Sequence, residues 1–502
     1  MTVTIGTPGV VGCRRPVVIA TVLAALALGG VASVLVHTRG APPASVGAAR
    51  GAAGLPGAVS SAWFCAGPLP VGTPGEASSL AIVNPGGRPL GATVMIVPVS
   101  GAPTTEKISV PAAGESVVGF ASIRRTSFAA ARVIVEGGAA EVVERVAGAT
   151  GLEASACADE SAATQYLAAG STAAHNNLAI ALYDPGATPA VASISFATPT
   201  GPQSPPAFQG VLVAAGHTVV LYAAHALPFK RFVSATVAAS GGAIVAGALD
   251  IVGSRGAQYD ALESAVPTPA TQWYFAAAPA GTSAQQTFDL ENPGKRTAVV
   301  EISLGGSTGV GKIALPVGPG ATTRYTPAAD ESAAAVRWAS VTSTNKVPIV
   351  AARELYLGTA LAVPPPTTRR AAVRQRRLLF RLPTLPVGLT VDPGAPKLAK
   401  DWIVAAGESG SRVSEFVTVA NPSMVPADVV IRPLGGGFAG LGSLRVAPEG
   451  SVVVDLADLA GASGRLSLRV TADEPVVVGG ELYSRSARGS PGLTALAAFP
   501  VG

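Results

Sequence analysis

The chain has 502 residues, of which 48% are hydrophobic, 13% charged and 5% aromatic. That length predicts several domains, and a charged fraction near half of the usual value of about 25% predicts a weakly charged surface. The net charge of +5 is not arranged as basic stripes with interleaved aromatic residues, which excludes a general nucleic-acid-binding protein.

The N-terminal segment predicts a membrane anchor. Residues 17–36 contain no charged side chain, and as a helix they span roughly 30 Å, the thickness of a bilayer core. Arg14 and Arg15 precede this run, so the positive-inside rule places residues 1–16 in the cytoplasm and the bulk of the chain outside it. The expected partner of the anchor is the lipid bilayer. A cleaved signal peptide is the alternative, although its apolar region is usually shorter. Residues 37–60, rich in Gly, Ala, Pro and Ser, predict a flexible tether.

Cysteine usage is consistent with export. Cys65 and Cys157 are the two cysteines that follow the apolar run, and Cys13 precedes it. An oxidising compartment allows the two to pair, and a bridge closing about 90 residues stabilises a fold by roughly 4–5 kcal/mol on the chain-entropy argument. The alternative is two separate buried thiols. Four histidines and no Cys-x-x-Cys pattern predict no metal site, and we expect no cofactor.

A fourfold repeat organises the chain after the tether. Each copy places an aromatic residue before an Asn-Pro or Asp-Pro turn, and a Gly-containing turn and a closing hairpin after it. The leading aromatic residues are Trp63, Tyr166, Trp273 and Trp402. The turns are Asn84-Pro85, Asp184-Pro185, Asn292-Pro293 and Asn421-Pro422. Asn caps its own backbone and Pro lacks a donor, so each pair ends a strand. Alternating apolar residues within the copies predict β-strands.

We therefore expect an all-β fold: an N-terminal transmembrane helix followed by four tandem immunoglobulin-like β-sandwich repeats. A copy of roughly 80–100 residues with about seven short strands suits a two-sheet sandwich. The alternative is a closed ring in which each repeat is one propeller-like blade, although a blade needs only about 40–50 residues. The expected units are 61–150, 151–262, 263–362 and 398–502, with a Pro- and Arg-rich linker at 363–397.

Six arginines crowd into that linker. They are Arg369, Arg370, Arg374, Arg376, Arg377 and Arg381. A charge run of this kind is usually a solvated connector, which is the interpretation we favour. The sharper hypothesis is a contact surface for anionic lipid headgroups, teichoic-type polymers or an acidic partner.

The recurring tryptophans Trp63, Trp273 and Trp402 are the first candidates for a binding role. Recurrence at the start of each unit favours a structural anchor in the core. If exposed, the three would instead contact a glycan or a partner. The similar strand endings Glu354-Leu355-Tyr356 and Glu481-Leu482-Tyr483 are also expected to serve packing and hydrogen bonding.

Catalytic and metal-binding arrangements find little support. His175, His217 and His225 all lie in the second unit, but no carboxylate spacing accompanies them, so we expect exposed or core histidines. Asp289 and Glu291 share one face of a strand, and we expect that face to be solvated. A calcium site is the weaker alternative, because calcium needs six to eight oxygens. No catalytic residue is assigned.

The repeat resembles tandem extracellular modules of actinobacterial envelope proteins. There, an aromatic start leads into an apolar strand ending at Asn-Pro-Gly, and a Pro-Ile-Val strand ends in Glu and an aromatic residue. Residues 348–356 here read Pro-Ile-Val-Ala-Ala-Arg-Glu-Leu-Tyr. With its anchor and cysteine pair, the chain resembles over about residues 10–500 a membrane-anchored actinobacterial family of undefined function. The resemblance supplies no catalytic residues.

The anchor, the repeats and the missing catalytic constellation together predict a non-enzymatic envelope protein. It would act as a scaffold or partner-binding module, with envelope proteins or surface glycans as partners and a role linked to surface-glycan assembly. The alternatives are an array of carbohydrate-binding modules that uses exposed tryptophans, and a hydrolase built around the histidines of the second unit.

Overall fold

The computed structural model describes most of the chain after residue 59. The described residues are 60–71, 77–121, 123, 126–148, 151–254, 257–276, 284–306, 309–327, 336–357, 388–410, 413–435, 441–456, 464–484 and 492–501. They belong to one compact unit, Ala49–Gly502. The expected anchor at 17–36 lies outside the described residues, within which no helix is long and apolar enough to cross a membrane.

The described part of the chain is built of β-strands, with two 3₁₀ turns of three residues each, η1 (Pro206–Phe208) and η2 (Ala223–His225). This confirms the predicted all-β class. The strands form multiple sheets, and each repeat contributes two of them or the equivalent parts of larger ones. We call the repeats modules 1 to 4.

Module 1 shows the plan. Its first sheet has the order β1 (Ser60–Pro70), β6 (Phe128–Glu136), β3 (Leu90–Pro98), β4 (Thr104–Val110). Its second has the order β5 (Gly114–Gly119), β2 (Ala77–Asn84), β7 (Glu141–Gly148), β8 (Gly151–Ala156). Two facing sheets bury the apolar side chains of alternate positions between them, which is the arrangement of a sandwich.

Modules 2 and 3 repeat this plan and share a sheet. In module 2 the strands are β9 (Thr164–Leu167), β10 (Asn176–Tyr183), β11 (Ala190–Thr198), β12 (Gly201–Gln203), β13 (Val211–Val213), β14 (Thr218–Tyr222), β15 (Ser234–Ser240), β16 (Val245–Ser254) and β17 (Ala257–Ser264). In module 3 they are β18 (Gln272–Ala276), β19 (Ala284–Asn292), β20 (Ala298–Gly306), β21 (Gly309–Val317), β22 (Ala321–Tyr325), β23 (Val336–Ser343), β24 (Val350–Leu357) and β25 (Gly388–Pro393). A parallel bridge between Thr198 and Ala321 joins β11 to β22, so the sheet runs on from one module into the next.

Module 4 follows the plan with one long strand. Its strands are β26 (Ala399–Ser409), β27 (Val413–Asn421), β28 (Ala427–Leu434), β29 (Leu441–Val446), β30 (Gly450–Asp455), β31 (Gly464–Ser484), β32 (Gly492–Leu496) and β33 (Ala498–Pro500). The first half of β31 pairs with β26 and β28, and its second half pairs with β27 and β32. Because the described repeats each divide between two sheets, the alternative of one propeller blade per repeat is wrong.

Two strands lie where the sequence suggested a different organisation. β8 occupies the first residues of the expected unit 151–262, yet it pairs with β7 of module 1. β25 falls in the expected linker 363–397, yet it pairs with β24 and completes the second sheet of module 3. Each is the eighth strand of its module.

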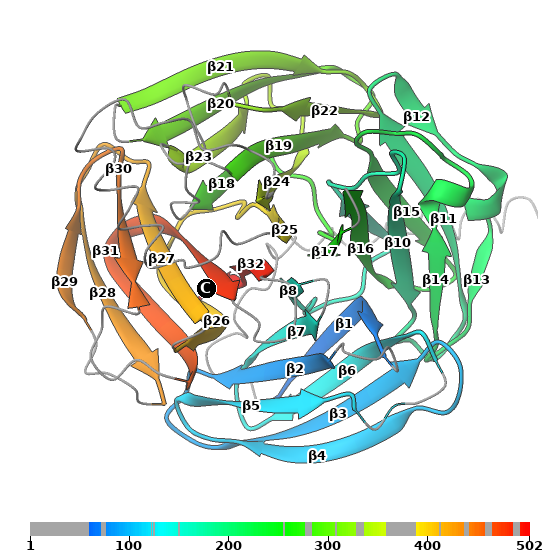
Figure 1. Ribbon diagram of the computed structural model, residues 1–502, viewed down its shortest axis with the longest axis horizontal. Helices are drawn as coiled ribbons and strands as arrows, with labels where there is room; N and C mark the ends of the chain where they lie inside the picture. Colours follow the sequence, from blue (N-terminus) through cyan, green and yellow to red (C-terminus); the bar gives the residue numbers. More distant parts are fainter. Residues whose placement is uncertain are drawn as a thin grey trace, which may run out of the picture. The chain divides into compact units, whose positions relative to one another are not determined.

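In each module one further strand pairs with the strand just before it, and these four closing strands, β8, β17, β25 and β32, contact one another, as Figure 1 shows. The backbone N of Ala154 in β8 donates to Oγ1 of Thr494 in β32 at 2.8 Å, and the N of Ala495 donates to Oγ1 of Thr390 in β25 at 2.8 Å. The hydroxyls of Ser155 in β8 and Ser264 in β17 lie 3.0 Å apart. Hydroxyl side chains therefore link different modules here.

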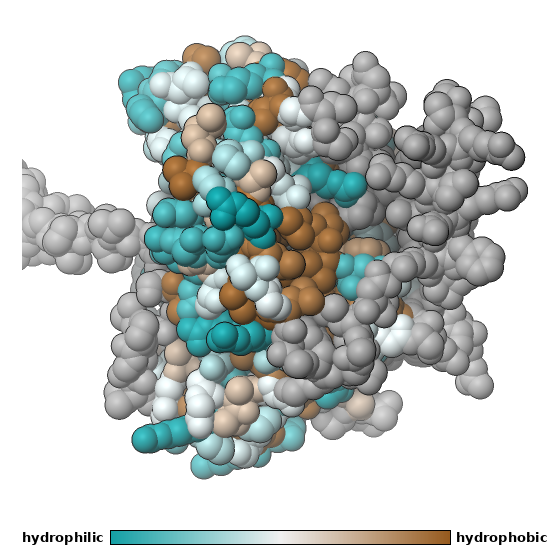
Figure 2. Space-filling model, turned by 90° about the vertical axis from the view of Figure 1, so that its left-hand side faces the viewer, coloured by the Kyte–Doolittle hydropathy of each residue, from teal (hydrophilic) through white to brown (hydrophobic). Residues whose placement is uncertain are grey.

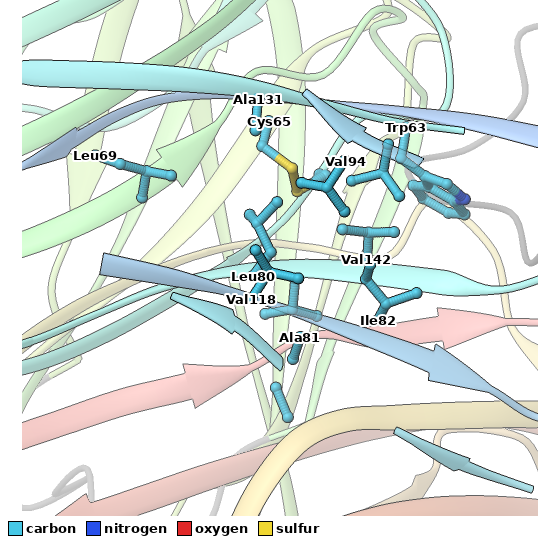
Figure 3. Packing of buried hydrophobic residues seen from close by; sticks show 14 of the residues in the cluster. Trp63, Cys65, Leu69, Leu80, Ala81, Ile82, Val94, Val118, Ala131 and Val142 are labelled. Carbon is cyan, nitrogen blue, oxygen red and sulfur yellow. A yellow bond between two sulfur atoms is a disulfide. The ribbon is translucent and has the colours of Figure 1, made fainter. Parts of the chain in front are cut away.

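The core of module 1 contains the predicted disulfide. Cys65 on β1 and Cys157 after β8 form a bond with an S–S distance of 1.99 Å, and both are buried. Figure 3 shows the bond among Leu80, Val94 and the other apolar side chains of the cluster, with Trp63 beside them. The predicted pairing is confirmed, and it fixes the first strand of the module to the end of its last.

The Asn-Pro and Asp-Pro turns are tied into the sheets by their side chains. In all four, Oδ1 accepts a hydrogen bond of 2.7 to 3.1 Å from the backbone N two residues later. In the three asparagine turns, Nδ2 donates to the carbonyl four residues later and to a strand 25 or 26 residues along. Asp184 has no such donor, and its Oδ2 accepts from the N of Ala190 at 3.0 Å.

The surface reflects the low charged content. Figure 2 shows the face with the strands of module 4, where apolar residues gather in one patch beside hydrophilic ones. Met424 and Val425, in the turn of that module, are 74% and 54% exposed. Exposed apolar residues such as these two are ordinary on protein surfaces, and nothing in the described residues shows a partner that covers them.

Candidate functional site between modules 2 and 3

A polar pocket with a volume of about 560 Å³ lies between modules 2 and 3. Volumes of 300–1,000 Å³ are usual for sites that bind small molecules. Four of the lining residues that the strands contribute are Asp250 on β16 of module 2, and Thr287, Arg324 and Glu354 on β19, β22 and β24 of module 3. The polar and aromatic lining residues are Ser171, Asn176, Arg231, Phe232, Asp250, Gln285, Thr287, Arg324, Thr326, Glu354 and Tyr356.

Arg324 of β22 organises the module 3 side of this pocket. Its Nε and Nη2 donate to the two carboxylate oxygens of Asp289 at 2.7 and 2.6 Å, and Nη2 also donates to Oε2 of Glu354 at 2.6 Å. The strand register explains the arrangement, because Asp289 on β19 is directly opposite Arg324 and Glu354 lies on the next strand, β24. Bidentate pairing of a guanidinium with a carboxylate is strong and directional, so it fixes these side chains in place.

An aromatic ring covers the same guanidinium. The Cζ of Arg324 lies 5.2 Å from the ring centroid of Phe232, which module 2 supplies. Guanidinium groups within about 6 Å of a ring face are attracted by its negative electrostatic potential. The contact therefore connects the two sides of the pocket.

Asp250 of β16 is the buried carboxylate on the module 2 side. It is 3% exposed, and its Oδ1 accepts a hydrogen bond of 3.2 Å from the backbone N of Ser171. Its Oδ2 is buried and has no hydrogen-bond partner among the described residues. Burial, reinforced by the nearby charge of Glu354, raises the pKa of Asp250 well above its usual range.

Thr287 of β19 presents a second unpartnered group to the pocket. The residue is 4% exposed, and within the described part of the chain its buried hydroxyl makes no hydrogen bond. Unsatisfied buried polar atoms are uncommon in folded proteins, because each costs about 1–3 kcal/mol of desolvation without compensation. Buried atoms without a partner also occur elsewhere in the described part of the chain, so these two are distinguished by belonging to residues that line the pocket, where a ligand could meet them.

Burial and pairing with Arg324 shift the pKa of the neighbouring carboxyl groups in opposite directions. Burial raises the pKa of Asp289 and of Glu354, and the Arg324 guanidinium opposes that rise. Burial lowers the pKa of Arg324, but the charges of Asp289 and Glu354 outweigh it and raise that pKa overall. Arg324 therefore stays charged at every physiological pH.

The expectation that Asp289 and Glu291 form a solvated face is wrong. Both are 1% exposed. Asp289 pairs with Arg324, and Glu291 accepts a hydrogen bond of 2.6 Å from Oγ1 of Thr236 in module 2. Burial raises the pKa of Glu291 to about 7. The second module covers this face, which the alternation within one strand does not reveal.

The tryptophans are buried. Trp63, Trp273 and Trp402 are 0%, 1% and 0% exposed. The Nε1 of Trp273 donates to Ile349 O at 2.9 Å, and that of Trp402 donates to Ala399 O at 3.0 Å and to Val476 O at 3.2 Å. The alternative in which these residues contact a glycan or partner is therefore corrected, since no ring face is accessible.

In module 2, the place of the tryptophan belongs to Gln165 and not to Tyr166. Gln165 is 1% exposed, and its Nε2 donates to Ile244 O at 2.9 Å, as Trp273 does to Ile349 O. Three residues before each of them, an isolated β-bridge pairs with the residue whose carbonyl accepts the hydrogen bond: Ala162 pairs with Ile244, and Ala270 pairs with Ile349. A side-chain amide thus replaces the indole N–H as donor.

The histidines do not line the polar pocket, although His175 adjoins two of its lining residues in sequence. His175, His217 and His225 are all exposed. His175 is in a left-handed conformation, with φ of 70°, between the lining residues Ala174 and Asn176. The Nδ1 of His217 is 2.8 Å from the carbonyl of Ala215, and the ring of His225 is 5.7 Å from that of Tyr222. None of the three is among the described residues that line the pocket.

The strand endings have different roles in the two modules. Glu354 and Tyr356 line the pocket, and the ring of Tyr356 packs edge-to-face on Tyr259 of module 2 at 5.8 Å. Glu481 forms a salt bridge of 3.0 Å with Arg353, and the hydroxyl of Tyr483 donates to it at 2.8 Å. The arginines of the expected linker, Arg369 to Arg381, lie outside the described residues.

Sequence reasoning missed the two residues that matter most here. Asp250 interrupts the solidly apolar run of residues 243–252, and a lone carboxylate in such a strand is a signal of a buried polar site. Arg324 gives no comparable signal, because its partners Asp289 and Glu354 lie 35 and 30 residues away.

Comparisons with known proteins add little to this picture. Residues 126–265, from β6 of module 1 to the end of module 2, match a family described as "Family of unknown function (DUF5719)". A search of curated proteins finds no match.

Two solved structures share a weak likeness with the chain. The "Crystal Structure of Thermotoga maritima 1070" is 14% identical, with a TM-score of 0.17, and the match covers 20% of this chain and 94% of that one. The "Crystal structure of tetra-tandem repeat in extending region of large adhesion protein" is 10% identical, with a TM-score of 0.10, and covers 82% and 92%. At these TM-scores neither structure indicates a fold or a function for this chain.

Proposed function

We propose that the chain is a non-enzymatic, membrane-anchored extracytoplasmic protein that acts as a scaffold or partner-binding module of the cell envelope. In this proposal residues 17–36 hold it in the bilayer, and modules 1 to 4 lie outside the cytoplasm. The pocket between modules 2 and 3 is its binding site.

The observation that supports binding most directly is the pair of unpartnered groups in that pocket. The Oδ2 of Asp250 and the hydroxyl of Thr287 are buried there without hydrogen-bond partners in the described part of the chain. A protein that keeps such groups loses stability unless a ligand satisfies them. Hydrogen bonds to Asp289 and Glu354 hold the Arg324 side chain in one position. The side chains around it therefore need little reorganisation when that ligand binds.

The disulfide supports the location. Cys65 and Cys157 are bonded and buried, and structural disulfides persist in oxidising compartments while cytosolic proteins rarely keep them. This agrees with the topology expected from Arg14 and Arg15 ahead of the apolar run. An envelope location also suits a link to surface-glycan assembly, which the resemblance to envelope modules suggests.

Location can be tested with a single engineered cysteine. Leu212 is 64% exposed, and Leu212→Cys should react with a membrane-impermeant maleimide on intact spheroplasts. Both chains carry Cys13→Ser, and the one without Leu212→Cys is the control, because its remaining cysteines, Cys65 and Cys157, are bonded to each other. Labelling only after the membrane is broken would refute the extracytoplasmic location.

Partner binding is tested separately. Chemical cross-linking of intact cells followed by purification of the full chain should recover an envelope component. A purification that yields the chain alone, at cross-linker levels that capture known membrane complexes, would contradict the scaffold role.

A further inference from the structure

We infer that the ligand of the pocket between modules 2 and 3 is an uncharged carbohydrate. This inference rests on the proposed function, because it specifies what the same site binds. It uses the charges, the unpartnered atoms and the aromatic rings of the pocket, and none of the buried tryptophans.

The charges exclude a strongly ionic ligand. Asp250 and Glu354 bring two carboxylates to the lining, and Arg231 and Arg324 bring two guanidinium groups. Arg324 already pairs with Asp289 and Glu354, so an anion could reach it only by displacing a bidentate carboxylate, and an anion bound to the exposed Arg231 instead would lie in a lining that also holds Asp250 and Glu354. A cation would lie beside two arginines. A neutral ligand avoids both costs.

The unpartnered atoms require a group that both donates and accepts. Oδ2 of Asp250 needs a donor while the carboxyl is ionised and an acceptor when it is protonated. The hydroxyl of Thr287 can serve in either direction. A ligand hydroxyl satisfies both positions in every protonation state, and carbohydrates carry several hydroxyls at fixed spacing.

The planar side chains complete the match. Asn176 and Gln285 add amide donors and acceptors, and Phe232 and Tyr356 add rings. The C–H face of a pyranose packs against such rings while its hydroxyls reach the polar groups around them. A mostly apolar small molecule would leave most of these polar groups unpaired.

An exposed aromatic residue, Phe229, lies on the segment that carries the lining residues Arg231 and Phe232. Phe229 lies two residues before Arg231 and is 78% exposed, and it holds a left-handed conformation with φ of 62°. Its backbone N donates to the carbonyl of Thr172 at 2.7 Å, which anchors it next to the lining residue Ser171. A bulky residue is kept in this costly conformation only when its surroundings impose it. Phe229 would stack against a second sugar unit at the rim.

The test uses the full chain purified without glycoside detergents. The probes are methyl glycosides of glucose, galactose, mannose and arabinose, with glucose 6-phosphate and glucosamine as charged comparators. Saturation-transfer NMR and calorimetric titration should detect at least one neutral glycoside, and the charged comparators should bind more weakly.

Matched variants locate the binding. Thr287→Val and Asp250→Ala should each weaken it by at least about tenfold, because each removes a hydrogen-bonding atom from the pocket. Thr418→Val is the control, since Thr418 of β27 is also fully buried with an unpartnered hydroxyl but does not line the pocket. Both threonine variants should fold equally well. Phe229→Ala should weaken binding of a disaccharide and leave a monosaccharide unchanged.

Three results would overturn the inference. One is binding of the charged comparators alone, and another is sugar binding that Thr287→Val and Asp250→Ala leave intact. The third is the absence of sugar binding by a chain that still captures its envelope component on cross-linking. That last result would refute the carbohydrate ligand while leaving the proposed function standing, whereas failure of the cross-linking would refute the proposed function itself.

Discussion

At the scale of single residues, one side-chain amide defines the repeat. The Nδ2 of Asn292 donates to Arg296 O at 2.8 Å and to Val317 O at 2.9 Å, while its Oδ1 accepts from Gly294 N at 3.0 Å. An aspartate would present a second acceptor to the two carbonyls. Module 2 tolerates Asp184 because the N of Ala190 lies within reach of its Oδ2.

Asn292→Asp should therefore destabilise the protein by about 3 kcal/mol at neutral pH, since it buries an unpaired charge against two carbonyls. Asn177→Asp is the control and should cost less than about 1 kcal/mol, because the Oδ1 of Asn177 accepts from the N of Ala224 and its Nδ2 donates to no carbonyl of the described residues. Urea unfolding monitored by tryptophan fluorescence measures both. Equal effects of the two substitutions would show that the buried amide is not a structural tie.

Buried carboxyl groups make stability depend on pH. Burial raises the pKa of Glu144 to about 8, although the backbone N of Gly67 donates to its Oε2 at 3.1 Å. The folded state then keeps a proton that the unfolded state releases above the ordinary pKa of 4.5. The contribution of this group is fully present below that value and is lost as the pH rises towards 8.

Stability should thus fall between pH 5.5 and 7.5, by up to about 1.4 kcal/mol per pH unit for this one group. Glu144→Gln keeps the shape and stays neutral, so it should flatten the dependence by that amount. Glu136→Gln, at the exposed end of β6, should not change it. An unchanged slope in Glu144→Gln, from unfolding midpoints at several pH values, would contradict the assignment.

The residue types of the repeat predicted the wrong residue at one core position of module 2. The pattern of leading aromatic residues selected Tyr166, whereas Gln165 makes the hydrogen bond that the tryptophan indoles make in modules 3 and 4. The role needs a buried N–H donor, which an amide supplies as well as an indole does. Aromatic character was therefore the wrong property to align, while the turns and the cysteine pair were identified correctly.

At the scale of elements, the closing strands β8, β17, β25 and β32 are the feature that the sequence concealed. β8, β25 and β32 begin with Gly-Leu, at Gly151-Leu152, Gly388-Leu389 and Gly492-Leu493, and this shared start could have identified them. In the sequence without the structure, the polar residues of these strands resemble those of a linker. Each pairs with the preceding strand of its own module, and hydroxyl groups of neighbouring modules also accept hydrogen bonds from the backbone of β8 and β32, which is a long-range effect.

Thr494→Val should destabilise the protein by about 1–3 kcal/mol, because it leaves the buried N of Ala154 without its acceptor. Thr105→Val, exposed on β4, is the matched control and should change the unfolding free energy by less than about 0.5 kcal/mol. Hydrogen exchange should also show faster exchange at Ala154 in the first variant. Unchanged protection there would mean that this contact does not hold β8 in place.

At the scale of the whole molecule, function depends on contacts between modules. The repeat and its two-sheet plan could be predicted from turns and alternation, since these are local signals. The pocket could not, because Asp250 and Phe232 of module 2 meet Arg324 of module 3 only in the folded chain. The four modules share the pattern of their core residues and differ in the residues that contact a neighbouring module.

The most direct test of a binding site at this place is photo-cross-linking in living cells. A photoreactive phenylalanine analogue replaces Thr326, an exposed residue of the pocket lining, or Leu212 on the outer surface of module 2 as control. We expect an envelope component to be captured from position 326 and not from 212, and Thr287→Val to reduce the yield. Capture from 212 alone, or equal capture from both positions, would contradict a binding site between modules 2 and 3.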